Sequence, residues 1–278
     1  MWGISIFAAK FLKMEDGLMG WDDAGSRQRD ASLLTKMYGN EEEGLRQPFS
    51  REGYDDSVSS SRSHCVDVPH VRQLCNWDCG LACVLMVLRT FGMNDFSIHD
   101  LEEFCCTTSI WTVDLAYLLK KFSIKFSFFT VTLGANPDFS SEAFYKEQLH
   151  DDRGRVNTLF EEALEAGIRI EHRSLSGNDI SLLMLSGGCI AIALVDKYKL
   201  RENCHFTHLS DYSHFIVICG YDGEKDEFDI RDPASSRKQE RIPLACLEVA
   251  RKSFGTDEDI LLPRAPSISS PRHRFRSP

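Results

Sequence analysis

The sequence lacks an apolar run long enough to cross a bilayer. The apolar N-terminal stretch, residues 1–14, is shorter than the roughly 20 residues that a membrane-spanning helix needs, and it has no small-residue cleavage site. We therefore expect neither a secretory signal nor a membrane span, and we predict a cytoplasmic protein. Weak contact of this N-terminal segment with a membrane surface stays open, because Lys10 and Lys13 lie among its apolar residues.

The sequence also lacks the local patterns that most directly mark a bound phosphate or a structural metal. It has no glycine-rich loop of the P-loop type. Its ten cysteines include a series spaced by four, at Cys75, Cys79 and Cys83, but no CxxC pairs with accompanying histidines. We therefore predict no metal site, and free thiols in a reducing compartment.

A basic surface is missing as well. The formal net charge is −10, and residues 63–263 alone carry 20 basic and 31 acidic groups. This balance argues against a protein that binds nucleic acid. Residues 1–65, acidic and then serine-rich, and the basic Ser/Pro tail 263–278 are typical of disordered segments, so residues 66–262 form the one predicted domain.

The residues with the most distinctive chemistry lie at the start of one predicted helix. Residues 80–88 are an almost continuous apolar run with helical spacing, and Asp78 is a plausible N-cap, which places Cys79 in the first turn. The free N–H groups and the positive end of the helix dipole favour a thiolate at that position. Gln73 lies a few residues upstream, where its side-chain amide could donate to an oxyanion.

A base for this nucleophile is offered by the C-terminal third of the chain. Residues 214–221 are predicted to form a buried strand that begins at His214, and Asp232 lies just past the end of the next predicted strand, 227–230. In an antiparallel pair these two positions share one edge of the sheet, as a base and its orienting carboxylate must. The order cysteine, histidine, aspartate matches the spatial logic of thiol hydrolases. Our predicted catalytic residues are Cys79, His214, Asp232 and Gln73.

The predicted elements change from mostly helices to mostly strands along the chain, which indicates an α+β fold with the nucleophile helix packed on an antiparallel sheet. Further helices are predicted at 97–104, 110–121, 139–150, 155–166 and 176–185, and further strands at 122–129, 168–173 and 189–195. Ser109 or Thr112 is expected to cap the helix 110–121. The segment Asp151–Gly154 is expected to form a turn between two of the helices.

Two resemblances follow from these motifs. The spacing Q-x-x-x-W-D-C-G-x-A-C from Gln73 to Cys83, with His214 and Asp232 far downstream, resembles the papain-like fold of bacteriocin-processing peptidases. A more specific resemblance is to plant-type soluble guanylyl cyclases and their animal relatives. It is carried by residues 70–73, 77–83, 86–89, 109–118, 214–217 and 254–260 and spans about 66–262. The second resemblance implies conversion of GTP to cyclic GMP and pyrophosphate, with Mg²⁺ or Mn²⁺ as cofactor.

The site residues themselves favour a different chemistry. A cysteine peptidase or other thiol hydrolase would act on a peptide or protein substrate and would need no cofactor. A third hypothesis is a catalytically inactive relative that binds a peptide. Each predicted site residue also has a purely structural alternative: a core thiol, a buried strand histidine, a turn aspartate before proline, and a surface glutamine.

Cyclase chemistry with two metal ions would need paired carboxylates and a cation for the transition-state charge. No spacing in the sequence singles such residues out. The candidates are Asp114, Asp232, Asp257, Asp259 and Arg231. The acidic run 257–259 could bind a divalent ion or simply form a solvated turn.

Overall fold

The computed structural model of the chain describes residues 63–136, 149–187, 189–200 and 213–264. The predictions for the N-terminal segment, for the basic tail and for most of the helix at 139–150 lie outside these residues. Among the helices that the structure describes, none is both long enough and apolar enough to cross a membrane.

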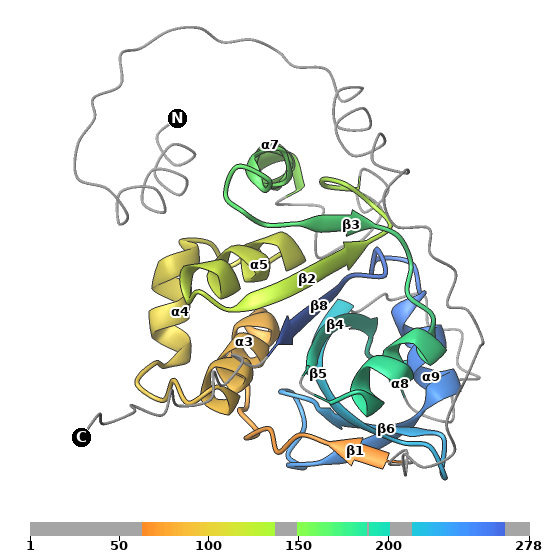
Figure 1. Cartoon of the computed structure of the whole chain (residues 1–278). Helices are drawn as coiled ribbons and strands as arrows, with labels where there is room; N and C mark the ends of the chain where they lie inside the picture. Colours follow the sequence, from red (N-terminus) through yellow and green to blue (C-terminus); the bar gives the residue numbers. More distant parts are fainter. Residues whose placement is uncertain (1–62, 137–148, 188, 201–212, 265–278) are drawn as a thin grey trace, which may run out of the picture.

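Eight strands of the described residues form one sheet, in the order β3-β2-β8-β4-β5-β6-β7, with β1 paired to the C-terminal part of β5 (Figure 1). The strands are β1 Ser63–Cys65, β2 Lys125–Thr130, β3 Ile170–His172, β4 Ala191–Asp196, β5 Ser213–Asp222, β6 Glu227–Arg231, β7 Glu240–Pro243 and β8 Ile260–Arg264. The pairs are antiparallel except β2 and β3, which run parallel. The sheet therefore extends slightly beyond both predicted domain boundaries, 66 and 262.

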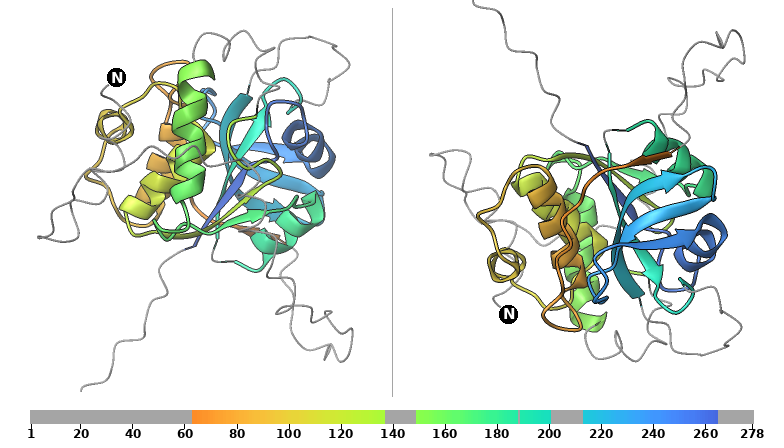
Figure 2. Two further views of the ribbon diagram at one scale, coloured as in Figure 1. Left: turned by 90° about the horizontal axis from the view of Figure 1, so that it is seen from above. Right: turned by 90° about the horizontal axis from the view of Figure 1, so that it is seen from below.

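Helices cover both faces of this sheet (Figure 2). They are α3 Cys79–Thr90, α4 Ile98–Cys105, α5 Thr112–Lys121, α7 Leu149–Glu162, α8 Gly177–Leu185 and α9 Leu244–Arg251. Residues of α3, α4, α5 and α7 form one apolar cluster, and residues of α8 and α9 belong to a second. Strand β5 serves both, because Phe215 and Val217 belong to the first cluster and Ile216 and Ile218 to the second. The predicted α+β class, with the nucleophile helix on the sheet, is confirmed.

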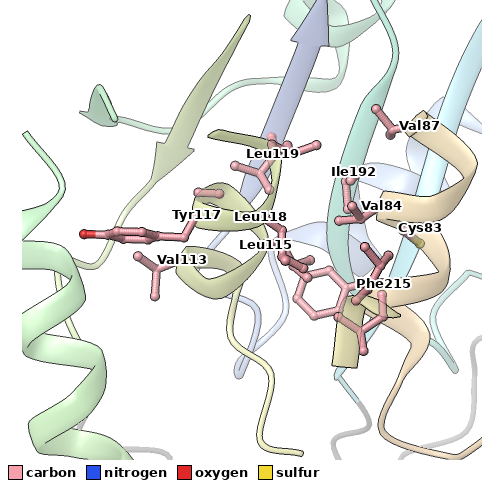
Figure 3. Close-up of a cluster of buried hydrophobic side chains, with 14 of the residues drawn as sticks. Cys83, Val84, Val87, Val113, Leu115, Tyr117, Leu118, Leu119, Ile192 and Phe215 are labelled. Carbon is pink, nitrogen blue, oxygen red and sulfur yellow. The ribbon is translucent and has the colours of Figure 1, made fainter. Parts of the chain in front are cut away.

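Helix α3 packs against β5 and against the helices α4 and α5, and every residue from Cys79 to Leu88 is buried. Figure 3 shows its side chains among those of α5 and the strands β4 and β5. Gly80 permits this close approach. A Cβ atom at that position would lie 3.0 Å from a methyl carbon of Leu115 and 3.1 Å from the ring of Phe215. Glycine therefore fixes the depth at which the helix start, and with it Cys79, sits on β5.

The predicted turn at Asp151–Gly154 is wrong, because α7 runs through it without a break. The reason lies in tertiary contacts that the local sequence does not reveal. The Arg155 guanidinium lies 3.1 Å from the Asp152 carboxylate one turn earlier and 2.5 Å from the buried Asp114 carboxylate of α5. These ion pairs hold the segment in helical form although Gly154 costs helix stability.

The N-terminus of α5 also differs from the prediction. Trp111, rather than Ser109 or Thr112, occupies the N-cap position. The Asp114 carboxylate accepts a hydrogen bond from the Trp111 backbone N–H at 2.8 Å, so the cap is provided by a side chain inside the first turn. By contrast, Ser97 caps α4 as the sequence suggests, with its hydroxyl accepting from the Asp100 N–H.

Candidate active site

Three side chains from three different elements meet at the start of α3. Cys79 is the first residue of that helix, His214 is the second residue of β5, and Asp232 follows directly on β6. The antiparallel pairing of β5 and β6 brings the start of one strand beside the end of the other. All three residues are nearly inaccessible, with exposed fractions of 7%, 5% and 9%.

The imidazole of His214 lies between the other two side chains. Its Nε2 atom lies 2.7 Å from Oδ1 of Asp232. The Cys79 thiol lies close enough to the same imidazole to raise its pKa. Since Nε2 is engaged by the carboxylate, Nδ1 is the nitrogen left for the sulfur. This arrangement gives the imidazole one fixed orientation between an acceptor and a thiol.

The charged forms of His214 and Asp232 stabilise each other. Burial by itself lowers the pKa of His214, but the hydrogen bond to Asp232 and the interactions with Cys79 outweigh it and raise the pKa to about 9. For Asp232, burial raises the pKa, but the hydrogen bond to His214, its positive charge and the N–H of Ala234 hold the pKa below its usual value. At neutral pH the site therefore holds an imidazolium beside a carboxylate.

The turn before α3 is held by Asp78, in a way that the sequence did not indicate. Asp78 occupies the N-cap position, but its side chain makes no hydrogen bond to the helix. It turns back instead, and its carboxylate accepts from the backbone N–H groups of Leu74 and Cys75, at 3.1 Å each. The first backbone hydrogen bond of the helix runs from the Ala82 N–H to the Asp78 carbonyl, so the N–H of Cys79 precedes this series.

Gln73, the predicted oxyanion donor, lies in that same turn. Its Nε2 donates to the Cys75 carbonyl at 2.6 Å. Because a primary amide carries two N–H bonds, this contact uses only one of them. The structure therefore places Gln73 in the loop that leads to Cys79, while its role as an oxyanion donor stays a prediction.

Residues that sequence reasoning missed fasten this loop to the end of β6. His70 donates from Nε2 to the backbone carbonyl of Asp232 at 2.9 Å, and the Gln73 N–H donates to the Pro233 carbonyl at 3.0 Å. The buried Arg231 donates from Nε to the Val68 carbonyl at 2.9 Å. Only the run His70 to Gln73 in the family resemblance hinted at these roles, because the partners lie some 160 residues away along the chain.

Three of the acidic candidates for a metal site have other partners, whereas one carboxylate oxygen of the buried Asp259 has no hydrogen-bond partner. Asp114 is bonded to Arg155, Asp232 to His214, and Asp257 accepts from the Thr132 hydroxyl and the Asn136 amide at 2.7 and 3.1 Å. Arg231, the candidate cation, is engaged by backbone carbonyls. In the part of the chain that the structure describes, no three His, Cys, Asp or Glu side chains are grouped to hold a metal ion. The described residues therefore do not fit a resident divalent cation.

Among the solved structures that resemble this chain are cysteine peptidases and a protein described as a peptidase. A C39-like peptidase, so described, from Bacillus anthracis is 13% identical, with a TM-score of 0.46, over 73% of this chain and 98% of that one. Xylellain, a cysteine protease from Xylella fastidiosa, is 9% identical, with a TM-score of 0.41, over 88% and 94%. Scores of this size describe a loose similarity in the path of the chain.

Sequence similarity to a protein of another description is much stronger than the similarity to these peptidases. "Guanylyl cyclase 1" of Arabidopsis thaliana is 57% identical over 225 residues, covering 77% of this chain and 82% of the relative. The sequence model of the family described as "Guanylylate cyclase" matches residues 68–262, which include all four predicted site residues. The chain therefore belongs to this guanylyl cyclase family.

Proposed function

We propose that this chain is a cysteine peptidase or other thiol hydrolase with Cys79 as its nucleophile. One observation carries the proposal: a cysteine at a helix start, a histidine and an aspartate lie together although they come from separate elements, and the histidine is hydrogen-bonded to the aspartate. A buried, oriented imidazole beside a thiol is what activates sulfur for attack on a carbonyl carbon. Apolar packing alone does not call for such an arrangement.

The reaction would proceed in two acyl-transfer steps. The Cys79 sulfur attacks the carbonyl carbon while its proton resides on His214. His214 then protonates the leaving amine or alcohol as the tetrahedral intermediate collapses, which leaves an acyl group on the sulfur. Water, deprotonated by the now neutral imidazole, releases that acyl group. Throughout, Asp232 holds the imidazole in one orientation and stabilises its positive charge.

We propose two N–H donors for the oxyanion. One is the backbone N–H of Cys79, which precedes the hydrogen bonds of α3. The other is the second N–H bond of the Gln73 amide, whose first is held by the Cys75 carbonyl. Donors that are fixed before the reaction stabilise the developing charge without reorganisation. We propose Gln73 as an oxyanion donor on this basis.

An acyl transfer from p-nitrophenyl acetate tests the proposal without knowledge of the natural substrate. The full-length protein is mixed with this ester, and acetylation of each cysteine is followed by peptide mapping while release of p-nitrophenolate is recorded. We expect Cys79 to be acetylated first and to turn over, because it has His214 beside it. Cys79→Ala should abolish the turnover.

The exposed Cys106 provides a matched control, because it lies at the end of α4. Cys106→Ala should leave turnover unchanged. If wild-type Cys106 is acetylated faster than Cys79 and nothing turns over, the chain is not a thiol hydrolase. In that case the inactive peptide-binding protein becomes the better hypothesis for the same site.

We propose guanylyl cyclase activity as the second candidate. Its support is the family match and the name of the 57% identical relative from Arabidopsis thaliana. GTP would be the substrate, cyclic GMP and pyrophosphate the products, and Mg²⁺ or Mn²⁺ the cofactor. The described carboxylates do not fit a resident metal, so we assign no residue of this chain to it.

Cyclic GMP formation measured by mass spectrometry tests this second candidate. Purified wild type and Cys79→Ala are compared with GTP and either metal ion. Metal-dependent turnover by both proteins would place the nucleotide reaction apart from the thiol site, and loss in the variant alone would link the two. If neither protein exceeds a mock purification, the isolated chain is not a cyclase.

A further inference from the structure

Two cysteines, Cys65 and Cys219, take no part in the reaction proposed above. Cys65 ends β1 and is exposed, whereas Cys219 lies on β5 and is fully buried. Strand β1 pairs antiparallel with β5 so that Cys65 stands opposite Gly220, the neighbour of Cys219. The Cys65 thiol donates to the Val66 carbonyl and the Cys219 thiol to the Asp229 carbonyl, and the two thiols lie close enough to shift each other's pKa.

The backbone places these residues at a separation that a disulfide can span. The Val66 N–H donates to the Cys219 carbonyl at 2.8 Å, which confirms the register at this point. Residues one step off a directly opposed antiparallel pair have Cα atoms roughly 6 Å apart. Disulfides are usually found at Cα separations of about 4.4–6.8 Å. A β-bulge at Ile218/Gly220 leaves Cys219 outside the regular register with β6.

Gly220 is required for this approach of the two strands. A Cβ atom on Gly220 would lie 2.6 Å from the His64 carbonyl oxygen and 2.8 Å from Cβ of Cys65. No side chain at this position could be accommodated without displacing β1. The glycine thus allows β1 to lie directly against the strand segment that carries Cys219.

We propose that Cys65 and Cys219 form a peroxide-sensitive dithiol that closes to a disulfide between β1 and β5. This inference is independent of the proposed function. The exposed Cys65 is the thiol that an oxidant can reach, and the buried Cys219 is the resolving thiol. The disulfide would tie β1 to the strand that also carries His214.

The electrostatics suit these two roles. The interaction with Cys219 lowers the pKa of Cys65 to about 7, and the positive charges of Arg231 and Arg241 act in the same direction against burial and Asp229. The same interaction and burial raise the pKa of Cys219. One sulfur is therefore partly ionised near neutral pH while its partner keeps its proton. Attack on peroxide requires the former, and condensation with loss of water uses the latter.

The chemistry balances with hydrogen peroxide as the oxidant. The Cys65 thiolate attacks one peroxide oxygen, the O–O bond breaks, and Cys65 sulfenic acid and hydroxide form. The Cys219 sulfur then attacks the sulfenic sulfur, the S–O bond breaks, and the departing hydroxide takes the Cys219 proton to leave as water. Two thiol sulfurs lose two electrons, and peroxide is reduced to two waters. A thiol reductant reverses the step by exchange.

Non-reducing peptide mapping of the full-length protein tests the proposal. The reduced protein is treated with a small excess of hydrogen peroxide, quenched with a maleimide, digested and analysed by mass spectrometry. We expect a Cys65–Cys219 linked peptide that disappears with dithiothreitol. Cys219→Ser should instead accumulate the sulfenic acid on Cys65, which dimedone traps, and Cys65→Ser should give neither product.

Cys106→Ser serves as a matched control, because it removes another exposed thiol and should leave the linked peptide in place. The oxidised wild type should also melt several degrees above the reduced form, since a cross-link that closes a long loop restricts the unfolded chain. Cys65→Ser should melt at the same temperature with and without peroxide. The proposal is overturned if peroxide links Cys65 to another cysteine or another molecule, or if it leaves Cys65 reduced at doses that oxidise Cys106.

Discussion

Asp232 and Asp259 are both buried aspartates beside the end of a strand, yet their surroundings shift their pKa values in opposite directions. Asp232 faces the His214 imidazole and the Ala234 N–H, which keep its carboxyl group ionised. Asp259 precedes β8, where burial and the nearby Asp257 raise its pKa well above the usual value while only the hydroxyls of Thr112 and Thr130 oppose this.

The difference shows that burial of an acid does not by itself make a reactive site. At Asp232 the positively charged His214 stabilises the carboxylate. The negative charge of Asp232 in turn raises the pKa of His214, which lies beside the proposed nucleophile Cys79. Asp259 instead belongs to a loop that ties β8 to β2, in which the Val131 N–H donates to the Asp257 carbonyl at 3.0 Å. The acidic run 257–259 is therefore explained as a structural connection between β8 and β2 rather than a solvated turn or an ion site.

The largest expected effect on the reactivity of Cys79 comes from removing His214, the partner of Asp232. His214→Ala should lower the rate of Cys79 acetylation by roughly a hundredfold or more, because the sulfur loses its proton acceptor. Peptide mapping after timed exposure to p-nitrophenyl acetate measures the rate. Asp259→Asn should leave the rate near that of wild type, and an equal loss in both variants would contradict the contrast.

A change in packing can disturb the site while all of its polar groups remain. Gly80→Ala should lower the free energy of unfolding by about 1–3 kcal/mol, because the new methyl group overpacks against Leu115 and Phe215. Urea unfolding measures the loss. Gly154→Ala in α7 is the control, since its Cβ would meet nothing within 4 Å and should raise stability by about 0.5–1 kcal/mol. Equal stabilities for the two variants would show that α3 can shift without cost.

A smaller effect is expected from removing only the charge of the orienting carboxyl group. Asp232→Asn keeps an acceptor for His214 but no longer holds its pKa near 9, so the imidazolium is lost at lower pH. We expect the alkaline limb of the pH profile of ester turnover to shift downward, with about a tenfold lower rate at pH 8. A profile identical to that of wild type would mean that Asp232 does not control the charge of His214.

The same pair links stability to pH. The raised pKa of His214 contributes stability that is fully present below pH 6.5 and is lost as the pH rises toward 9. The lowered pKa of Asp232 contributes stability that is present above pH 3.8 and is lost as the pH falls through the native pKa. Unfolding free energies of wild type should therefore decline between pH 6.5 and 9, and those of Asp232→Asn should decline less.

The smallest effect is expected from a substitution at Asp259. Because the native pKa of Asp259 is raised, its contribution to stability is greatest at low pH and decreases as the pH rises above the ordinary value of 3.8. Asp259→Asn cannot ionise, so its unfolding free energy should match or exceed that of wild type at pH 8 by up to about 1 kcal/mol. Urea unfolding at pH 5 and pH 8 measures the difference. A large loss at both values would show that Asp259 is needed as a carboxyl group.

Much of the site could be predicted because it depends on local sequence patterns and on the pairing of two strands that are neighbours in the sequence. A cap before an apolar run places Cys79, and an antiparallel pair of strands brings His214 to Asp232. The structure confirms these positions, and the catalytic roles stay predictions. Sequence reasoning missed His70 and the backward turn of Asp78, because both depend on backbone atoms that only the folded chain brings near.

The incorrect predictions have the same origin. The predicted turn at Asp151–Gly154 becomes helix through the ion pairs of Arg155, and one of these reaches α5. The pairing of β1 with β5 joins residues about 155 positions apart, so no local sequence pattern could predict it. Local propensity gave way in each case to a contact between distant parts of the chain.

The pH dependence of alkylation at Cys79 tests the central claim most directly. Iodoacetamide is added to the full-length protein from pH 5 to pH 9, and peptide mapping gives the rate at each cysteine. We predict that at pH 6 Cys79 reacts at least tenfold faster than the exposed Cys106, and that His214→Ala removes this advantage. Rates at Cys79 that follow those of Cys106 across the whole range, with or without His214, would contradict a thiol activated by the imidazole.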